Sequence, residues 1–334
     1  MKVIIPVAGV GTKLRPHTYT QPKAMVPVAG KPIISHIVDF LMQGGLRDFV
    51  FIIGYMGDRI KKFMLSNYKD AGIKMHFVVQ DPRKGSAHAI HVAEKFFKEE
   101  EEILISLGDK IHHFDLKSFL QLDYTAVGVK KVENPRLFGI IEMGKDQFAK
   151  KFTEKPLIPK SNLGLVGIYK IKNVPRFIEA INYLIKHQVK TLDEFHLTDA
   201  LMHMVNLGER ICTMEVDGWY DCGKKETLLE ANAILLNRPG FRTSDYNGCP
   251  YTIIIQPVRI GKNCDIQNSI IGPNVVVGDD THVHSCTIRN SIIGSFSELD
   301  NLILDNSLIG NDSSLKGASK SLNVGDNTQI NLGG

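Results

Sequence analysis

Glycine and basic residues follow the first apolar segment of the chain, where they could hold a phosphate group. The segment Ala8-Gly9-Val10-Gly11-Thr12-Lys13 comes directly after residues 3–7, and Arg15 and Lys23 follow shortly behind it. Glycines let backbone N–H groups approach a phosphate chain closely, and basic side chains can neutralise its charge. The segment has neither the third glycine of a dinucleotide-binding fingerprint nor the Gly-Lys-Ser/Thr of a Walker loop. These residues therefore predict a phosphate-binding loop of another kind.

Two aspartates stand at positions suited to a metal ion. Asp109 follows the apolar residues 103–107, where a carboxylate has little structural reason to be, and Asp221 comes just after Trp219, the only tryptophan. Mg²⁺ prefers oxygen ligands and keeps several waters, so one or two carboxylates together with substrate phosphates suffice. We therefore predict that Asp109 and Asp221 bind Mg²⁺. An aspartate after a strand can also be a turn or cap residue, which is the alternative.

The elements that must position these residues alternate between strand and helix patterns in the first half of the chain. We expect strands at 3–7, 49–53, 75–79 and 103–107, with helices at 33–42, 58–66 and 87–97. This alternation predicts a parallel sheet with helices on both faces, in which ligands bind beyond the carboxyl ends of the strands. The glycine loop, Gln80 and Asp109 each follow one of these strands. They should therefore meet at one edge of the sheet.

The second half of the chain changes character twice. Strand and helix patterns continue in the same domain to about residue 238, with strands at 126–129, 139–143, 148–152, 165–171 and 211–216, and helices at 175–186, 197–205 and 226–236. A stretch with several Pro, Gly, Asn and Ser residues then predicts a linker over 239–252. Beyond it, Asn-Ser-(Ile/Leu)-Ile-Gly recurs at 268–272, 290–294 and 306–310. Aliphatic residues about six apart predict the stacked coils of a parallel β-helix over 253–334, which we expect to support a homo-oligomer.

Composition excludes several classes of protein. The net charge of +4 is mild and the basic residues are spread along the chain, so we expect no nucleic-acid partner. Apolar runs are far shorter than the roughly 20 residues of a membrane helix, and the N-terminus is unlike a signal peptide. Five cysteines without a C-x-x-C pair argue against a disulfide framework and a zinc site. We therefore predict a cytoplasmic protein.

Ordered motifs over nearly the whole chain resemble those of the sugar-1-phosphate nucleotidylyltransferases, typified by glucose-1-phosphate thymidylyltransferases. The family signature is G-x-G-T-R-L-x-P-x-T followed by P-K-x-x-x-P-V and K-P, which residues 9–18, 22–28 and 31–32 match except at Lys13. Further matches are Gln80 and residues 85–87, 107–109, 138–139, 154–156, 161–162, 167–169, 197–200 and 219–223. The resemblance implies an α/β fold with a Rossmann-like, mixed, mainly parallel sheet, followed by a left-handed β-helix as in longer members.

The resemblance also implies a reaction, in which a nucleoside triphosphate and a sugar 1-phosphate are joined with release of pyrophosphate, aided by Mg²⁺. The preferred pair is dTTP and glucose 1-phosphate, giving dTDP-glucose. Because two anions must meet, cations and positioning are the main requirement. The catalytic residues implied are Lys13, Arg15, Lys23 and Asp109. The nucleotide-binding residues implied are Ala8, Gly9, Gly11, Thr12, Gln80 and Gly85, and the sugar-phosphate-binding residues are Gly139, Glu154, Lys155 and Val166.

Individual roles follow from the same resemblance. Lys13 and Arg15 would hold the β and γ phosphates, Lys23 the α-phosphoryl oxygens, and Lys155 the sugar phosphate. Gln80 can present a donor and an acceptor to a base edge, which suits thymine or uracil, although a solvated turn glutamine is the alternative. Glu154 would accept hydrogen bonds from sugar hydroxyls.

Departures from the pattern leave other functions open. The family has arginine at the position of Lys13, and lysine loses the planar fork that binds two phosphate oxygens at once. A regulatory homologue that binds nucleotide or sugar phosphate without turnover is therefore one alternative, and an enzyme that uses UTP or GTP is another. A β-helix with acyltransferase activity would have to rely on its two histidines, His282 and His284. The remaining histidines considered as metal ligands, His88, His91, His112 and His113, are expected at the surface.

Overall fold

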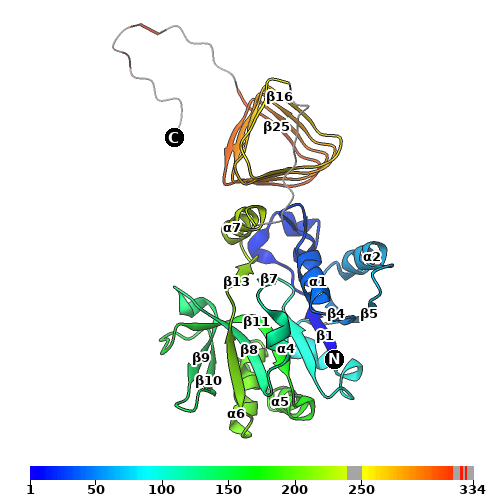
Figure 1. Cartoon of the computed structure of the whole chain (residues 1–334), viewed down its shortest axis with the longest axis vertical. Coiled ribbons are helices and arrows are strands. Elements are labelled where there is room, and N and C mark those ends of the chain that lie inside the picture. Colours follow the sequence, from blue (N-terminus) through cyan, green and yellow to red (C-terminus); the bar gives the residue numbers. More distant parts are fainter. Residues whose placement is uncertain (239–249, 319–323, 326–327, 329–334) are drawn as a thin grey trace. The chain divides into compact units, whose positions relative to one another are not determined.

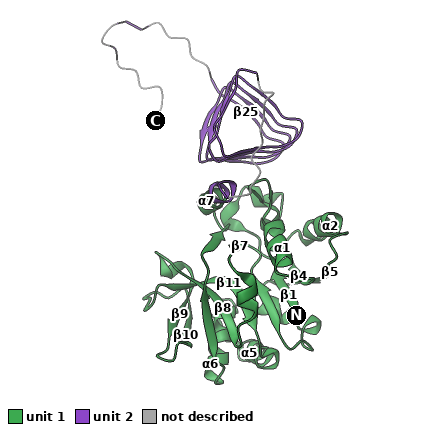
Figure 2. Ribbon diagram, viewed as in Figure 1, with its two compact units in different colours: residues 1–231 green, residues 232–334 purple. Residues whose placement is uncertain are grey.

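The computed structural model describes residues 1–238, 250–318, 324–325 and 328, which form two compact units (Figure 2). Unit 1 comprises Met1–Ala231 and unit 2 comprises Asn232–Gly334. The boundaries that we inferred at 238 and 252 stay a prediction. Residues 239–249 of the predicted linker lie outside the described residues, as do 319–323, 326–327 and 329–334 of the predicted β-helix.

A mixed sheet forms the centre of unit 1 (Figure 1). Its parallel part runs in the order β6-β1-β4-β5, made of β1 Lys2–Pro6, β4 Asp48–Ile53, β5 Lys74–Val79 and β6 Ile103–Ser106. Their Val, Ile and Phe side chains are buried almost throughout β1, β4 and β6, as expected for parallel strands covered on both faces. The helices that join them are α1 Ile33–Gln43, α2 Gly57–Asn67 and α3 Ser86–Val92. The predicted alternation of strands and helices is confirmed.

The rest of the sheet contains antiparallel pairs. It is built from β8 Thr125–Lys131, β9 Gly139–Met143, β10 Ala149–Glu154, β11 Leu163–Ile171 and β12 Ile211–Glu215. Strand β11 runs antiparallel to both β6 and β8, β9 and β10 form an antiparallel pair, and β12 is parallel to β8. One face packs against α3, α5 Val174–Lys186 and α6 Leu197–Asn206 in a single apolar cluster. The predicted class, a mixed and mainly parallel α/β fold, is confirmed.

The structure departs from the sequence prediction in the extent of one helix and in several short elements. The helix expected over 87–97 ends at Val92, and a separate 3-10 turn follows at Glu94–Phe96. Two short strands were not predicted, β7 Lys110–His113 and β13 Gly218–Asp221, which form an antiparallel pair of their own. The remaining short elements are β2 Pro27–Val28, β3 Lys31–Pro32, α4 Leu116–Leu120, and 3-10 turns at Thr12–Leu14, His17–Tyr19, Lys23–Met25 and Pro135–Leu137. Helix α7, Lys225–Leu236, crosses the division between the units.

Unit 2 contains a parallel β-helix whose three sheets form the sides of a triangular coil (Figure 1). The first sheet has β14 Ile253–Ile254, β17 Ile270–Ile271, β20 Thr287–Arg289 and β23 Ile303–Asp305; the second has β15 Val258–Ile260, β18 Val275–Val277, β21 Ile292–Ile293 and β24 Leu308–Ile309; the third has β16 Asp265–Gln267, β19 His282–His284, β22 Glu298–Asp300 and β25 Ser314–Lys316. Inward Val, Ile and Leu side chains form its core. The hand of the coil and its part in oligomerisation stay predictions.

The recurring asparagines of the repeat lie at the corners of the coil. Asn268, Asn290 and Asn306 have φ values of 50°, 46° and 48°, in the left-handed region that asparagine tolerates better than most residues. The serines that follow Asn268 and Asn290, Ser269 and Ser291, are buried and accept hydrogen bonds from backbone N–H groups of the next coil. The repeat therefore reflects corner geometry.

Two further findings concern membrane spans and cysteines. Within the described residues, no helix combines the length and the apolar character needed to cross a membrane. The cysteines in that part of the chain, Cys212, Cys222, Cys264 and Cys286, form no disulfide.

Candidate active site

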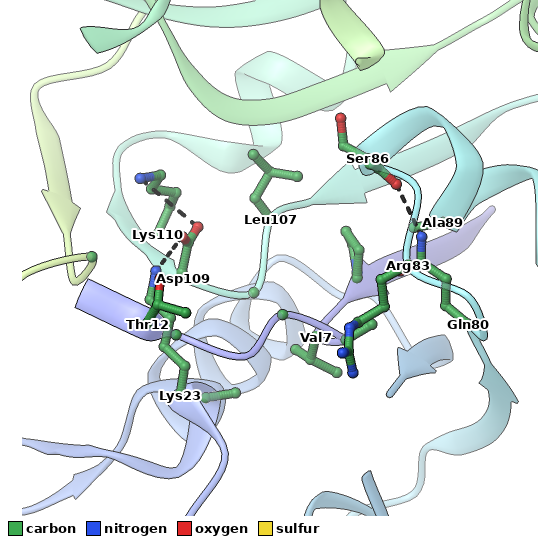
Figure 3. Close-up of a pocket in the computed structure, with 18 of the residues that line it drawn as sticks. Val7, Thr12, Lys23, Gln80, Arg83, Ser86, Ala89, Leu107, Asp109 and Lys110 are labelled. Atoms are coloured by element: carbon green, nitrogen blue, oxygen red, sulfur yellow. Dashed lines mark hydrogen bonds and ion pairs between the residues drawn. The ribbon is translucent and has the colours of Figure 1, made fainter. Parts of the chain in front are cut away.

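A cavity of about 460 Å³ lies at the carboxyl ends of β1, β5 and β6 in unit 1 (Figure 3). Its volume is in the range of small-molecule sites. Ten predicted site residues line it, namely Ala8, Gly9, Gly11, Thr12, Lys13, Lys23, Gln80, Gly85, Asp109 and Asp221. The structure therefore brings the phosphate loop, the base-reading candidate and both metal-ligand candidates to one place.

Two glycines allow the loops of the cavity to approach one another. Gly11 has φ of 71°, and a Cβ atom on it would lie 2.9 Å from Cβ of Lys23. A Cβ on Gly108 would lie 2.2 Å from Cγ1 of Val7 and 2.7 Å from the carbonyl oxygen of Pro6. Larger residues would push the loop after β1 away from Lys23 and from the loop after β6.

Four charged side chains form a connected cluster at this edge. Nζ of Lys23 lies 2.5 Å from Oδ2 of Asp109, and Nζ of Lys110 lies 2.6 Å from Oδ1 of Asp221 and 3.8 Å from Oδ1 of Asp109. Figure 3 shows Asp109 between the two lysines. Strands β7 and β13 bring Asp221 to Asp109 and Lys110. Asp221 pairs directly with Lys110, and the N–H of Cys222 donates to the carbonyl oxygen of Asp109.

The electrostatics of the cluster stabilise the ionised form of Asp109. Burial acts to raise the pKa of Asp109, but the charges of Lys110 and Lys23 outweigh it and hold that pKa below its ordinary value. Burial acts to lower the pKa of Lys110, but Asp109 and Asp221 raise it above its ordinary value. Burial, with Asp221 next in importance, raises the pKa of the Cys222 thiol to about 12. These shifts favour the charged forms of both Asp109 and Lys110 at neutral pH.

The side chain of Gln80 is held in a defined orientation. Its Nε2 donates to the carbonyl oxygen of Gly85 at 3.0 Å and lies 3.2 Å from Nδ1 of His88. Burial, with smaller contributions from His91 and Lys84, lowers the pKa of His88, which favours the neutral ring that can accept this hydrogen bond. With Nε2 engaged on both partners, Oε1 remains as an acceptor for a ligand.

Among the histidines expected at the surface, His113 is exposed and His88 and His91 are partly buried. The expectation is wrong for His112, which is only 3% exposed, and its Nε2 lies 2.8 Å from the carbonyl oxygen of Val166. His112 lies on the inward-facing side of strand β7. The expectation failed because this strand was not predicted.

Five predicted site residues do not line the cavity, namely Arg15, Gly139, Glu154, Lys155 and Val166. Arg15 is exposed, with its guanidinium 4.9 Å from the ring centre of Tyr19. Oε2 of Glu154 accepts a hydrogen bond from Thr198 at 2.6 Å, and a Cβ on Gly139 would lie 3.0 Å from the same oxygen. Burial raises the pKa of Tyr169, and the charges of Glu154 and Asp109 add to the effect, so this cluster lies near the cavity.

Several lining residues were missed by the sequence analysis, namely Arg83, Ser86, Lys110 and Glu194. Lys110 directly follows Asp109, and that position beside a metal-ligand candidate was the available signal. Ser86 belongs to the matched motif 85–87, and its Oγ accepts from the N–H of Leu197 at 2.9 Å. Arg83 and Glu194 are exposed, and no pattern in the sequence distinguished them from other surface charges.

The donor set of the cavity suits Mg²⁺. One ammonium group contacts both Asp109 and Asp221, so a single cation can be shared between these carboxylates. The described part of the chain has no group of three or more His, Cys, Asp or Glu side chains that could enclose a metal. Two carboxylates without further side-chain ligands fit an ion that takes its other oxygens from water and phosphate.

Comparisons with known proteins identify the family of the chain. Residues 2–238 match the family model described as "Nucleotidyl transferase". The low-salt glycan biosynthesis nucleotidyltransferase Agl11 of Haloferax volcanii is 29% identical over 99% of this chain and 100% of its own length. The bifunctional protein GlmU of Methanocaldococcus jannaschii is 35% identical over 71% of this chain, which spans 55% of that relative's length.

Two solved structures share the fold. A protein of Bacillus anthracis assigned as a glucose-1-phosphate thymidylyltransferase is 26% identical, with a TM-score of 0.61, over 72% of this chain and 96% of that one. A UDP-glucose pyrophosphorylase in complex with UDP-glucose is 25% identical, with a TM-score of 0.61, over 70% and 97%. The chain therefore belongs to the nucleotidyl transferase family, and its resemblance to the sugar-1-phosphate nucleotidylyltransferases is confirmed.

Proposed function

We propose that unit 1 transfers a nucleotidyl group from dTTP to glucose 1-phosphate, giving dTDP-glucose and pyrophosphate. A phosphate oxygen of the sugar 1-phosphate attacks the α-phosphorus. The bond from that phosphorus to the oxygen bridging to the β-phosphorus breaks, and its electron pair leaves with pyrophosphate. The observation that carries the proposal is the single cavity that holds a glycine-rich loop, Lys23, Asp109 and Asp221.

The residues of the cavity have distinct tasks in this reaction. Backbone N–H groups of the loop Gly9–Thr12 and the side chain of Lys13 would bind the β and γ phosphates. Lys23, which contacts Asp109, would neutralise charge on the α-phosphoryl group. Asp109 and Asp221 would hold Mg²⁺, which supplies positive charge to the phosphates. Arg15 lies outside the cavity lining, so its proposed contact with phosphate requires its side chain to leave Tyr19.

Base recognition is proposed to depend on Gln80. Its free acceptor, Oε1, can receive the N3–H of thymine or uracil, whereas the N3 of cytosine is itself an acceptor. The methyl group that separates thymine from uracil is worth only about 1–3 kcal/mol in an apolar pocket. UTP is therefore the nearest alternative, and GTP, with its own N1–H donor, is a further one.

The sugar phosphate is proposed to bind at the cluster beside the cavity. Glu154 offers carboxylate oxygens for sugar hydroxyls, and Lys155 offers a cation that is 42% exposed and can reach a phosphate. Gly139 and Val166 would line the same subsite. Glucose is the preferred sugar because the sequence motifs resemble those of the glucose-1-phosphate thymidylyltransferases.

A second candidate function is regulatory binding without turnover, and Lys13 is the observation that favours it. Its single ammonium replaces the planar fork of the arginine found in the family signature. The retained Lys23, Asp109, Lys155 and Asp221 favour the enzyme instead.

Pyrophosphate release tests the proposal. Each of the four dNTPs and four NTPs is paired with glucose, mannose, galactose and N-acetylglucosamine 1-phosphates in the presence of Mg²⁺. We expect turnover with dTTP and glucose 1-phosphate. Turnover with another pair corrects the substrates, and nucleotide binding without turnover for every pair supports the regulatory function instead.

A further inference from the structure

The ammonium group of Lys110 contacts both carboxylates that the proposed function assigns to Mg²⁺. Its Nζ lies 2.6 Å from Oδ1 of Asp221 and 3.8 Å from Oδ1 of Asp109. The side chain of Lys110 is only 15% exposed, and its backbone pairs with Asp221 across β7 and β13. A positive charge of the protein itself therefore bridges the two proposed metal ligands.

Stability alone is a poor explanation for this arrangement. A largely buried ion pair contributes little compared with apolar residues of similar size, because both charges must be taken out of water. Lys23 already supplies a counter-charge to Asp109. The second lysine makes the cluster neutral without any metal, since two ammonium groups then face two carboxylates.

We propose that Lys110 is a positioning residue that acts as an internal stand-in for the metal, holding Asp109 and Asp221 together in the free protein. The inference rests on the proposed function insofar as these aspartates bind Mg²⁺. A divalent ion that approaches Asp221 has to displace the ammonium group, so the free protein binds such ions weakly. A triphosphate in the cavity offers Lys110 another partner and releases Asp221. Metal entry is thereby coupled to nucleotide entry.

Titration of the full chain with Mn²⁺, without nucleotide, tests the inference when free Mn²⁺ is followed by electron paramagnetic resonance. Lys110→Met keeps most of the side-chain length and removes the charge. We expect its Kd for Mn²⁺ to be at least about tenfold lower than that of the wild type, because the competing cation is gone. Lys110→Arg should bind as weakly as the wild type. An unchanged or higher Kd for Lys110→Met overturns the inference.

Matched variants separate this effect from damage to the fold. Lys131→Met removes an exposed lysine of β8 and should leave the Kd unchanged. Lys110→Gln is the second neutral variant should Lys110→Met fail to fold, as judged by circular dichroism and thermal unfolding. A loss of packing would weaken metal binding, whereas the inference requires it to strengthen.

A double variant shows where the ion binds. Asp221→Asn added to Lys110→Met should return the Kd to about the wild-type value, and persistent tight binding overturns the inference. The proposed function is tested separately by pyrophosphate release. An inactive protein refutes that function while the Mn²⁺ titration still decides the role of Lys110, and an active protein with an unchanged Lys110→Met Kd refutes only the inference.

Discussion

Charged side chains are arranged in opposite ways in the two units of the chain. In unit 1, Lys23 and Asp109 face one another in a cavity, with side chains 16% and 31% exposed. In unit 2, His284 and Asp265 also face one another, but on the outside of the β-helix, with side chains 43% and 42% exposed. Charges that are shielded from water interact more strongly with a ligand. The pair in unit 1 is therefore better suited to bind a charged ligand than the pair in unit 2.

The two units also differ in how they position a residue. The β-helix repeats one coil, so each residue stacks on the residue at the equivalent position of the next coil, as the register Ile270–Thr287–Ile303 shows. The site in unit 1 depends on loops that end different strands and on the isolated pair β7 and β13. A substitution in the β-helix should therefore affect stability, and one in the cavity should affect catalysis.

The largest expected effect is on catalysis and comes from Asp109→Asn. Loss of the carboxylate charge removes a proposed metal ligand and the partner of Lys23, so kcat should fall by about a hundredfold or more. Steady-state pyrophosphate release measures the change. Asp300→Asn, on the exposed side of β22, is the matched control and should retain wild-type kcat. Equal activity of the two variants would remove Asp109 from the mechanism.

The next effect concerns stability in the β-helix. Ile288 is fully buried in β20, and Ile288→Ala should cost about 2–4 kcal/mol of unfolding free energy through the cavity that it leaves. The control lies on the same sheet, since Ile303 in β23 is 86% exposed and Ile303→Ala should cost much less. Urea unfolding of both variants measures the difference. Similar losses would contradict the inward and outward assignment of these side chains.

A smaller effect is expected from Lys13→Arg. The planar fork can bind two phosphate oxygens, so the KM for the nucleoside triphosphate should fall by about two- to tenfold with little change in kcat. Initial rates at varied triphosphate concentration separate the two constants. Activity that appears only in the Lys13→Arg protein would favour the regulatory function for the natural chain.

The smallest effect should come from His284→Ala. The exposed pair with Asp265 lies in unit 2 and takes no part in the proposed reaction, so kcat and KM should stay within about twofold of wild type. The same variant can be assayed for consumption of an acyl donor. Acyl transfer by the wild type that is lost in His284→Ala would give the β-helix a chemistry of its own.

Sequence alone predicted the parts of the fold that repeat or alternate. The strands that precede the glycine loop and Asp109 were predicted because they are buried parallel strands, which read as continuous apolar runs. The pair β7 and β13 was missed because Lys110–His113 has no apolar pattern and its stability comes from a partner far along the chain. Because these two strands were not predicted, the bridging position of Lys110 and the burial of His112 were not predicted either.

The central claim is that the α-phosphoryl group of the triphosphate is transferred to the sugar phosphate, and following this phosphorus atom tests it most directly. The protein is incubated with dTTP labelled with ³²P at the α-phosphorus, glucose 1-phosphate and Mg²⁺, and the products are separated by chromatography. The account predicts that the label appears in dTDP-glucose, with unlabelled pyrophosphate released in equal amount. Label that stays in dTTP, or that appears only in dTMP, would contradict nucleotidyl transfer to the sugar phosphate.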